Sequence, residues 1–567
     1  MPTTPAARPA VSDLRNRPRA QVLIVGGGIN GVATFRYLAL QGIDVALVER
    51  GDYCQGASGA SSHMIHGGIR YLENGEFRLV RESVRERNTL LAIAPHYVKP
   101  LRTTIPIFST FSGILSAPAR FLTHRNAKPQ ERGALLIKAG LMMYDAFAGS
   151  GRLTERHRFH RRRRALADLP ALRPDVKYAA TYFDASVHNP ERLTLDVLHD
   201  GLAANPDSRA SNYLSLVSEH DGVARLRDEL TGDEFDFTAP VIVNATGAWV
   251  DLTNHALGGG SRFMGGTKGS HIVLDSPELL AACGGREIFF EHSDGRIVLI
   301  YPMGDRVLVG TTDLEADISQ PARCTPEEVD YFFELVNHVF PDVAVSREQI
   351  VYRFSGVRPL PRHDDTQPGF VSRDYRIERR SGARGTTVLS LVGGKWTTFR
   401  ALAEHLGAEV LDVLGRPAGP DTRALPIGGG RDYPRNAVER ERWISARTAR
   451  APRDRVAVLL ERYGTRTDEV LDACGPDDAP LRHCPELSVH ELVHMAREEQ
   501  VGRLVDVFIR RTSLAFRGLV TTGLIDECAG VLAPVLGWDA ERMAAERADA
   551  IRVLVEEHGV QFAPAAT

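Results

Sequence analysis

The sequence predicts an α/β protein in which one parallel sheet is assembled from separated segments, with a β-rich domain between them and a helical C-terminal domain. Three observations lead to this fold class. Apolar strand patterns run into glycines at three distant places, near residues 25, 245 and 393. Two strand patterns flank a turn at Gly304-Asp305, between the second and third of these places. Beyond about residue 415 the apolar spacing is helical and strand patterns are scarce.

The first glycine junction has the form of a dinucleotide-binding β-α-β unit. The apolar run 22–25 enters Gly26-x-Gly28-x-x-Gly31, a helical pattern follows, and a second apolar strand ends at Glu49. Such glycines allow a tight turn and close approach of the backbone to a pyrophosphate, and the terminal carboxylate can accept hydrogen bonds from a ribose. We therefore predict a Rossmann-type nucleotide site that includes Gly26, Gly28, Asn30, Gly31 and Glu49.

The other two junctions belong to the same predicted domain. The strand pattern 241–243 ends in Ala245-Thr246-Gly247, and the pattern that begins near 386 ends in Gly393-Gly394. A helix follows the second pair, with Thr397 or Thr398 as its expected N-cap. Three strand-to-glycine junctions over nearly 400 residues suggest one nucleotide domain built from separate pieces.

The domain boundaries follow from composition. We expect a disordered tail over 1–20, interleaved cofactor and substrate domains over 21–415, a Pro/Gly-rich linker over 416–433 and a helical domain over 434–560. Between them, "TPEEVDYFFELVNHVF" predicts a capped amphipathic helix that starts at Thr325. Likewise, "SVHELVHMAREE" has a capping-box spacing at Ser488 and Glu491.

Charge, cysteine content and apolar runs limit the functional class. A net charge of -3 offers no overall attraction to nucleic acid, so none is expected as a partner. Six dispersed cysteines without a C-x-x-C motif favour free thiols in a reducing compartment. No segment resembles a secretory signal or approaches a membrane span, which predicts a cytoplasmic protein. No ligand spacing suggests a metal.

The motifs together resemble one known family. "VGGGINGVA", "SSHMIHGGIRYLE", "VNATGAWV", "KGSHIV", "GTTD", "FSGVRPL", "SRDY" and "GGKWTTFRALAEH" occur in the order and approximate spacing of the FAD-dependent glycerol-3-phosphate dehydrogenases. The resemblance spans roughly residues 20–415, and the helical part with "RRT" (510–512) resembles the smaller C-terminal domain of that family. It implies a glutathione reductase/D-amino acid oxidase-like FAD-binding domain.

The resemblance also implies the reaction and assigns residues to it. Hydride would pass from C2 of sn-glycerol 3-phosphate to N5 of FAD and leave dihydroxyacetone phosphate. Further FAD contacts are expected at Ser61, Ser62, His66, Gly67, Gly68, Ala245, Thr246, Gly247, Gly393, Gly394, Lys395 and Thr397. Forked guanidinium donors, an ammonium and a phenol suit a phosphate dianion, so the expected substrate-binding residues are Arg70, Tyr71, Arg373 and Lys395, with Lys268 and His63 as further candidates.

Arginine and histidine candidates supply the chemistry at C2. Arg358, in "SGVRPL", matches the family's active-site arginine and would stabilise developing charge on the C2 oxygen. A histidine has a suitable intrinsic pKa for a general base. His66 and His271 are the leading candidates, and His63 is an alternative because the family commonly has lysine there. Thr311-Thr312-Asp313 is either a strand-end turn or a cofactor or substrate contact.

The substrate and the electron acceptor stay open between alternatives. The family usually passes electrons to a membrane quinone, and the arginine-rich stretch 156–164 would fit an anionic leaflet or a solvated helix end. The family's acidic stretch is replaced here by Asn189-Pro190-Glu191-Arg192-Leu193, and residues 111–133 form a longer connection. The alternatives are another polyol phosphate such as erythritol 4-phosphate, an oxygen-using oxidase, and a flavin-binding regulatory protein. A homodimer and contact with the inner face of the cell membrane also remain open.

Overall fold

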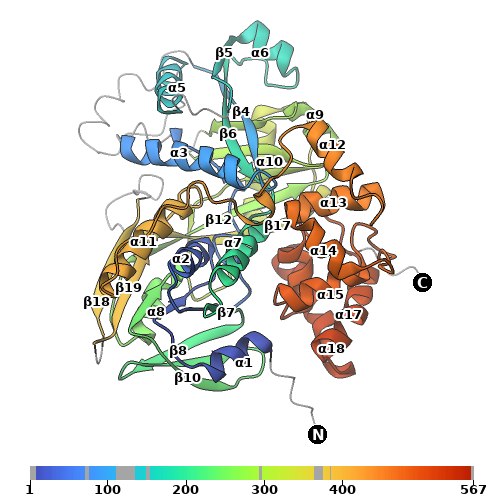
Figure 1. Ribbon diagram of the computed structural model, residues 1–567. Coiled ribbons are helices and arrows are strands. Elements are labelled where there is room, and N and C mark those ends of the chain that lie inside the picture. Colours follow the sequence, from blue (N-terminus) through green and yellow to red (C-terminus); the bar gives the residue numbers. More distant parts are fainter. Residues whose placement is uncertain are drawn as a thin grey trace.

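The computed structural model describes residues 8–69, 76–109, 134–148, 154–292, 296–362, 374–382 and 385–562. The chain forms two large sheets with their covering helices and a separate group of C-terminal helices (Figure 1). Arg70, Tyr71, Arg373 and the connection 111–133 lie outside the described residues.

A six-stranded sheet carries the predicted nucleotide domain, with the strand order β18-β19-β11-β1-β2-β7. β1 pairs in parallel with β2 and β11, and β11 pairs in parallel with β19. β1, β2 and β11 are buried along their whole length, which explains their continuous apolar sequences. The predicted assembly from distant segments is confirmed. The strands are β1 (Val22–Val25), β2 (Val45–Val48), β7 (Arg209–Ser211), β11 (Val241–Asn244), β18 (Arg376–Ser381) and β19 (Thr387–Val392).

Different layers cover the two faces of this sheet. Val22 and Ile24 of β1 pack into the core under helices α2 (Ile29–Leu40), α7 (Pro190–Ala204) and α11 (Phe399–Val413). The alternate residues Leu23 and Val25 pack toward the antiparallel strands β8 (Leu214–His220), β9 (Val223–Asp228) and β10 (Glu234–Thr238). With both faces covered, the carboxyl ends of the strands form the edge where a ligand can bind.

The second sheet has ten strands and supports the predicted β-rich domain. It contains the two strands expected around Gly304-Asp305. Helix α10 (Pro326–Val339) packs against this sheet. It begins with the predicted capping box, in which the Thr325 hydroxyl accepts from the N–H of Glu328 (3.3 Å). Its strands are β3 (Met64–Ile65), β4 (Val98–Ile107), β5 (Arg158–Arg161), β6 (Tyr178–Val187), β12 (Met264–Leu274), β13 (Glu287–Glu291), β14 (Ile297–Met303), β15 (Arg306–Gly310), β16 (Leu314–Glu315) and β17 (Ile350–Pro361).

A buried carboxyl group in this sheet makes stability depend on pH. Glu287 is fully buried, and only one of its oxygens has a hydrogen-bond partner within the described residues, the Thr103 hydroxyl at 2.6 Å. Burial raises the pKa of Glu287 to about 8. Between the ordinary carboxyl pKa, about 4.3, and 8 the folded protein therefore holds a proton that the unfolded chain has lost, and its stability falls as pH rises.

We expect Glu287→Gln to remove this part of the pH dependence. The amide keeps an oxygen for Thr103 and carries no charge to bury, so the variant gains stability over the parent as pH rises from 5 to 8. The expected relative gain is about 3–4 kcal/mol, because each pH unit in which only the folded chain keeps the proton costs about 1.4 kcal/mol. Urea unfolding of both proteins across this range checks it, and two parallel stability curves would contradict it.

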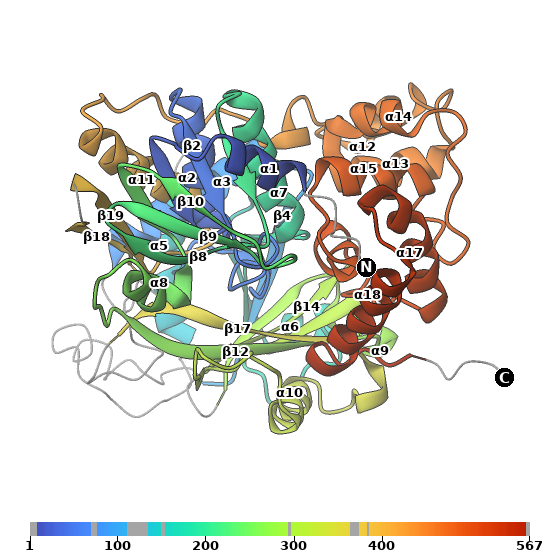
Figure 2. The same cartoon turned by 90° about the horizontal axis from the view of Figure 1, so that it is seen from below.

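The C-terminal part is helical, as predicted, and stands beside the sheets (Figure 2). Its core contains Leu459, Leu492, Phe508 and Leu524. The Ser488 hydroxyl caps its helix by accepting from Glu491 N–H (3.3 Å). The main helices are α12 (Ala437–Ser445), α13 (Arg453–Tyr463), α14 (Thr467–Cys474), α15 (Val489–Glu498), α17 (Thr522–Leu536) and α18 (Ala540–Arg552). All six cysteines are buried free thiols.

Buried ion pairs join this helical domain to the nucleotide domain. The Asp52 carboxylate, from the loop after β2, accepts from Arg510 Nε (2.6 Å) and from Arg511 Nη1 (2.6 Å) and Nη2 (3.0 Å). Nearby, Arg192 of α7 donates from Nη1 to both oxygens of Glu499 (2.6 Å each). These contacts hold the C-terminal helices against the loop that follows the second strand of the nucleotide fold.

Residues 8–20 correct the expectation of a disordered tail. Pro9–Asn16 forms helix α1, whose Val11 and Leu14 are buried in the core below the nucleotide sheet. Arg8 adds a hydrogen bond from Nη1 to Asn212 Oδ1 (2.9 Å). A short helix with two apolar positions gives a weak periodic signal, which is why composition alone missed it. The expected linker is also fixed at one point, where Ile427 N–H donates to the Ile93 carbonyl (2.9 Å).

Candidate active site

The glycines at the end of β1 are required by close packing. Gly26 has φ +115°, and a Cβ there would lie 2.6 Å from the Ala245 carbonyl oxygen. A Cβ at Gly31 would lie 2.0 Å from the Gly26 carbonyl oxygen. Because β1 and β11 pair from Val22↔Val241 to Val25↔Asn244, the first two glycine junctions meet at one edge of the sheet. The third arrives there with β19, whose Ser390 pairs with Asn244.

Glu49 lies at the carboxyl end of β2 and binds the backbone of the same edge. Its Oε2 accepts from Gly27 N–H (2.6 Å) and its Oε1 from Gly51 N–H (2.9 Å). Burial raises the pKa of Glu49, and these two N–H groups oppose that shift. The glycine turn therefore positions this carboxylate, and its contact with a ribose stays a prediction.

The start of α2 provides groups for a bound nucleotide. Asn30 is close to Gly394, where a Cβ would lie 2.7 Å from Asn30 Nδ2. The Oδ1 atom of Asn30 is buried and has no hydrogen-bond partner among the residues that the structure describes. The Ser58 hydroxyl accepts from Ile29 N–H (3.0 Å) in the first turn of the helix. A glycine-lined edge with a buried, unsatisfied acceptor fits a dinucleotide such as FAD.

The predicted segments around residues 61–66 and 393–397 also meet. The Thr397 hydroxyl donates to the His66 carbonyl (3.2 Å), and Trp396 Nε1 donates to the Ser58 carbonyl (2.8 Å). Ser61 Oγ accepts from His63 N–H (3.3 Å). Lys395 is partly exposed in the turn between β19 and α11. Thus two candidate FAD segments more than 300 residues apart are hydrogen-bonded to each other.

Gly67 is held by a buried network that sequence patterns did not reveal. Its N–H donates to Tyr144 Oη and to Asp184 Oδ1, both at 3.0 Å. Arg87 Nη1 donates to the same two atoms, at 2.8 and 3.0 Å. Tyr144 belongs to helix α5 (Ala134–Ala148), Arg87 to α3 (Phe77–Ile93) and Asp184 to β6. Tyr144 and Asp184 stand in no motif, and Arg87 ends the stretch "EFRLVRESVRER" (76–87), which resembles the family but indicated no role for this arginine. Only their convergence in space identifies the network.

Arg358 and His271 lie on one face of the second sheet. β12 and β17 pair antiparallel with Thr267↔Arg358 and His271↔Phe354 in register. Residues that lie directly opposite each other on paired strands point to the same face of the sheet, and so do alternate residues of one strand. Arg358, Phe354 and His271 therefore lie on the same face of the sheet as Gly269. A Cβ at Gly269 would lie 2.1 Å from Arg358 Nη2, which shows that this glycine leaves room for the guanidinium.

The guanidinium of Arg358 is fixed by the segment after β15. Nη1 donates to Asp313 Oδ1 (2.8 Å), and Nη2 donates to Thr311 Oγ1 (3.0 Å) and to the Thr312 carbonyl (2.8 Å). About a fifth of the arginine side chain stays exposed. The segment Thr311-Thr312-Asp313 therefore orients the arginine, a role beyond that of a simple strand-end turn.

His271 is buried beside the predicted cofactor segment. Its Nε2 lies 2.8 Å from Ser62 Oγ, and its ring stacks on Phe354 with centroids 4.8 Å apart. Burial, followed by the charge of Arg358, holds the pKa of His271 well below its usual range. The imidazole is consequently neutral at pH 7, the form that can accept a proton.

Two other candidates are held by structural partners, although the ring of His63 lies near Phe354, with centroids 6.0 Å apart. Lys268 is on the opposite face of β12, where Nζ donates to Glu328 Oε2 (2.8 Å) and to the Arg323 carbonyl (2.6 Å). His63 is buried and stacks on Phe516 of the C-terminal domain, with centroids 5.2 Å apart. Burial lowers the pKa of His63 to about 3. Both side chains therefore have structural partners in the folded protein.

The fold and its glycine-lined edge define an FAD-dependent oxidoreductase, and the family model described as FAD dependent oxidoreductase matches residues 21–407. A second model, the C-terminal domain of alpha-glycerophosphate oxidase, matches residues 420–543. A glycerol-3-phosphate dehydrogenase of Synechocystis sp. is 33% identical over 535 residues, covering 88% of this chain and 91% of the relative. The chain belongs to the FAD-dependent glycerol-3-phosphate dehydrogenase family, and FAD is its cofactor, as predicted.

Two further comparisons mark the breadth of this family. A D-erythritol 1-phosphate dehydrogenase of Brucella abortus is 30% identical over 502 residues, covering 87% of this chain and 93% of the relative. The solved glycerol-3-phosphate dehydrogenase of Bacillus halodurans, complexed with FAD, superposes with a TM-score of 0.73 at 22% identity and covers 96% of this chain and 97% of its own. This second likeness confirms the fold, including the helical C-terminal domain.

Proposed function

We propose that this chain oxidises sn-glycerol 3-phosphate to dihydroxyacetone phosphate and passes the electrons to a quinone. The observation that supports this most directly is the shared face of β12 and β17, which carries a fixed guanidinium and a neutral imidazole, the imidazole 2.8 Å from a serine of the cofactor segment. Oxidation of a secondary alcohol needs a hydride acceptor, a proton acceptor and a cationic phosphate site. Bound FAD supplies the first.

Residues of the chain would stabilise the C2 oxygen, accept the hydroxyl proton and bind the phosphate. Arg358 would attract the C2 oxygen and stabilise charge that develops on it. His271 would accept the hydroxyl proton at Nε2, the nitrogen that faces Ser62; His66 remains the alternative base. The phosphate would be bound by Arg70, Tyr71, Arg373 and Lys395. The first three lie outside the described residues, so their role rests on the motif alone.

A panel of polyol phosphates tests the substrate. We expect glycerol 3-phosphate to bleach the flavin of the purified protein anaerobically, at a rate well above that given by erythritol phosphates. The second candidate substrate is D-erythritol 1-phosphate, because the chain is 30% identical to the D-erythritol 1-phosphate dehydrogenase of Brucella abortus. Faster bleaching by this four-carbon ester would select it instead, and an unbleached flavin with every ester would favour a flavin-binding regulatory protein.

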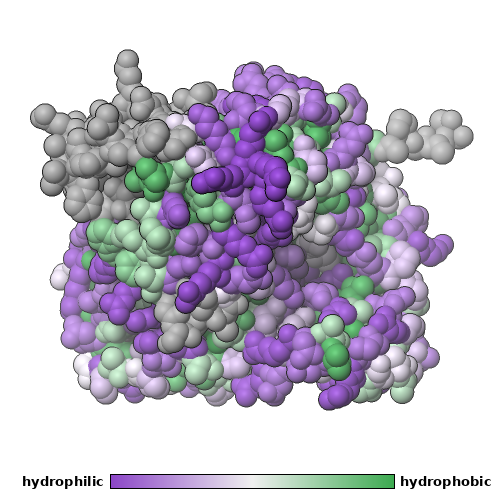
Figure 3. All heavy atoms as spheres, turned by 90° about the horizontal axis from the view of Figure 1, so that it is seen from above, coloured by the Kyte–Doolittle hydropathy of each residue, from purple (hydrophilic) through white to green (hydrophobic). Residues whose placement is uncertain are grey.

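The end of the molecule around α5 and α6 (Arg162–Asp168) supports a peripheral membrane contact. α5 exposes Leu135, Met142 and Met143. The segment 156–164 beside it carries exposed arginines on β5 and α6. Figure 3 shows hydrophobic residues next to a band of hydrophilic ones on this face. Apolar side chains together with cations favour an anionic lipid surface. Among the residues described, no helix has both the length and the apolar character needed to cross a bilayer.

Vesicles that contain a quinone test the acceptor. We expect turnover to be faster when the quinone is dissolved in vesicles with anionic lipid than in zwitterionic ones, because the arginines attract the anionic surface. Raising the salt concentration should reduce the difference by screening. Stoichiometric hydrogen peroxide in air, with no acceleration by quinone, would instead identify an oxidase.

A further inference from the structure

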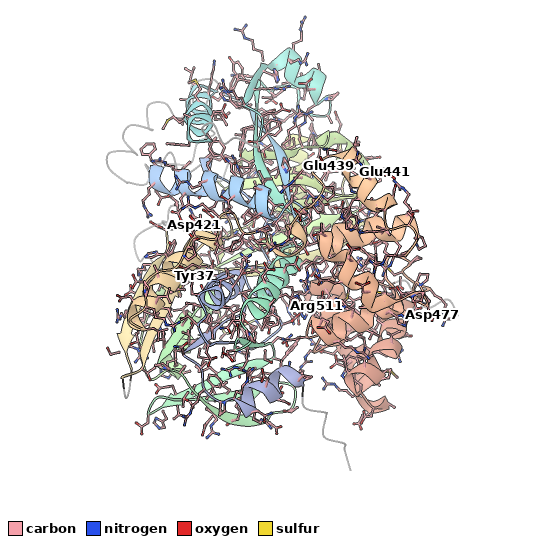
Figure 4. The ribbon with its side chains drawn as sticks, viewed as in Figure 1. Tyr37, Asp421, Glu439, Glu441, Asp477 and Arg511 are labelled. Atoms are coloured by element: carbon pink, nitrogen blue, oxygen red, sulfur yellow. The ribbon has the colours of Figure 1, made fainter. Side chains whose placement is uncertain are left out.

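A second candidate binding site lies where α7 meets the C-terminal domain. A cavity of about 340 Å³ is formed there by the first residues of α7, by α13 and by the turn after Arg511. Figure 4 places Arg511 at this border between α7 and the C-terminal helices. The segments 189–193 and 510–512, which drew attention in the sequence, both contribute to it, and neither takes part in the redox site. A cavity of this volume is at the lower end of the range for small-molecule sites.

The wall of this cavity is rich in arginine. Five arginines line it, against two glutamates, Glu461 and Glu486. Three of the five pair with carboxylates outside the lining: Arg192 with Glu499, Arg462 with Glu491, and Arg511 with Asp52. The other two pair with the lining glutamates, Arg440 with Glu461 (3.0 Å) and Arg517 with Glu486 (2.6 Å). These carboxylates accept from some of the N–H groups of each arginine. A guanidinium has five N–H donors in all. The lining arginines are Arg192, Arg440, Arg462, Arg511 and Arg517.

One of these arginines keeps an unsatisfied donor. Arg192 is 2% exposed, and its Nε is buried without a hydrogen-bond partner in the part of the chain that the structure describes. A buried donor without an acceptor costs about 1–3 kcal/mol, more for a charged group. An acceptor that reaches this Nε would remove the cost.

The start of α7 is an independent source of donors. The helix is 15 residues long and begins with Pro190, and its N-cap residue, Asn189, makes no side-chain hydrogen bond to the first turn. Asn189 lines the cavity. The N–H groups and the positive end of the helix dipole therefore favour an anion at the place where the arginines gather.

We propose that this cavity binds a small phosphorylated metabolite through its phosphate group. Guanidinium forks and a helix N-terminus match a tetrahedral oxyanion, and the space exceeds what a lone phosphate needs. Entry is open at the rim, because the side chains of Arg440 and Arg517 are 36% and 31% exposed. The ligand would contact Arg511, which also holds Asp52, so binding would tighten the contact between the two domains.

Calorimetric titration of the FAD-bound protein with inorganic phosphate and with 3-phosphoglycerate tests the proposal. The flavin spectrum, recorded in parallel, reports binding near the cofactor. We expect a binding event that leaves the flavin spectrum unchanged, separate from any event at the redox site, which changes that spectrum. This event should be tighter with 3-phosphoglycerate than with inorganic phosphate. An ester no tighter than phosphate would overturn the metabolite assignment, and absence of this event would overturn the site.

Variants locate the event in this cavity. Arg440→Gln combined with Arg517→Gln should weaken it at least tenfold, since both guanidiniums stand at the rim. Arg192→Lys keeps the charge that faces Glu499 but removes Nε, and it should weaken binding as well. Arg453→Gln is the matched control, because Arg453 starts helix α13, which helps to line the cavity, and pairs with Glu441, while neither residue is part of the lining. Equal affinity in all four proteins would overturn the assignment.

Discussion

Replacing Arg358 with alanine is expected to lower kcat/KM about 10²–10³-fold, corresponding to ~2.7–4 kcal/mol of transition-state stabilisation. The guanidinium is fixed by Asp313, Thr311 and the Thr312 carbonyl before any substrate arrives, so it meets developing charge without reorganising. FAD content should stay at the parental level, because none of these contacts belongs to the glycine-lined edge. Steady-state kinetics with the flavin absorbance as a reference measure both quantities.

Two companion variants separate the charge of Arg358 from its placement. Arg358→Lys keeps a cation but loses the fork that spans Asp313 and Thr311, and it should recover only part of the rate. Asp313→Asn weakens the contact that orients the guanidinium and should have a smaller effect than Arg358→Ala. The control is Arg376→Ala, an exposed arginine paired with Glu378 on β18. Parental turnover of Arg358→Ala would remove the central assignment of the proposed mechanism.

The second large effect is expected at the joint between the domains. Asp52→Asn removes the carboxylate that Arg510 and Arg511 share and leaves Arg510 paired with Asp506 alone. Loss of one member of a buried ion pair typically costs ~3–5 kcal/mol. We expect the thermal unfolding midpoint to fall by many degrees, with the C-terminal helices released first. Differential scanning calorimetry and limited proteolysis of the FAD-bound protein report these two effects. Asp233→Asn, at an exposed pair with Arg15, should change stability by less than about 1 kcal/mol.

The same joint also predicts the response to acid. Burial alone would raise the pKa of Asp52, but the guanidiniums of Arg511 and Arg510 hold it well below its usual range. A carboxylate with a depressed pKa contributes its stability above the unfolded value near 3.9 and loses it as pH falls below that value. The difference in unfolding free energy between the parent and Asp52→Asn should therefore shrink below about pH 4. A difference that stays constant down to pH 3 would contradict this assignment.

Periodicity and turn chemistry predicted much of the nucleotide domain. The run 22–25, the glycines after it and Glu49 form one local unit, so their spacing alone indicated a strand, a tight turn, a helix and a second strand. The capping box at Thr325 and Glu328 is equally local. The contacts of the other oxygen of Glu328 are not local, because Oε1 accepts from Ser270 Oγ (2.8 Å) on β12 and from Thr312 Oγ1 (2.6 Å) in the segment after β15.

The sequence by itself determined the β-α-β unit, the cofactor class and the helical character of the C-terminal part, because each depends on residues a few positions apart or on a motif read in order. The tertiary structure decided that Lys268 faces away from Arg358, that His63 packs on Phe516, and that Arg87, Tyr144 and Asp184 hold Gly67. These outcomes depend on strand register and on burial between distant segments. A shift of one residue in the pairing of β12 and β17 would reverse which side chains meet, and no local pattern encodes that register.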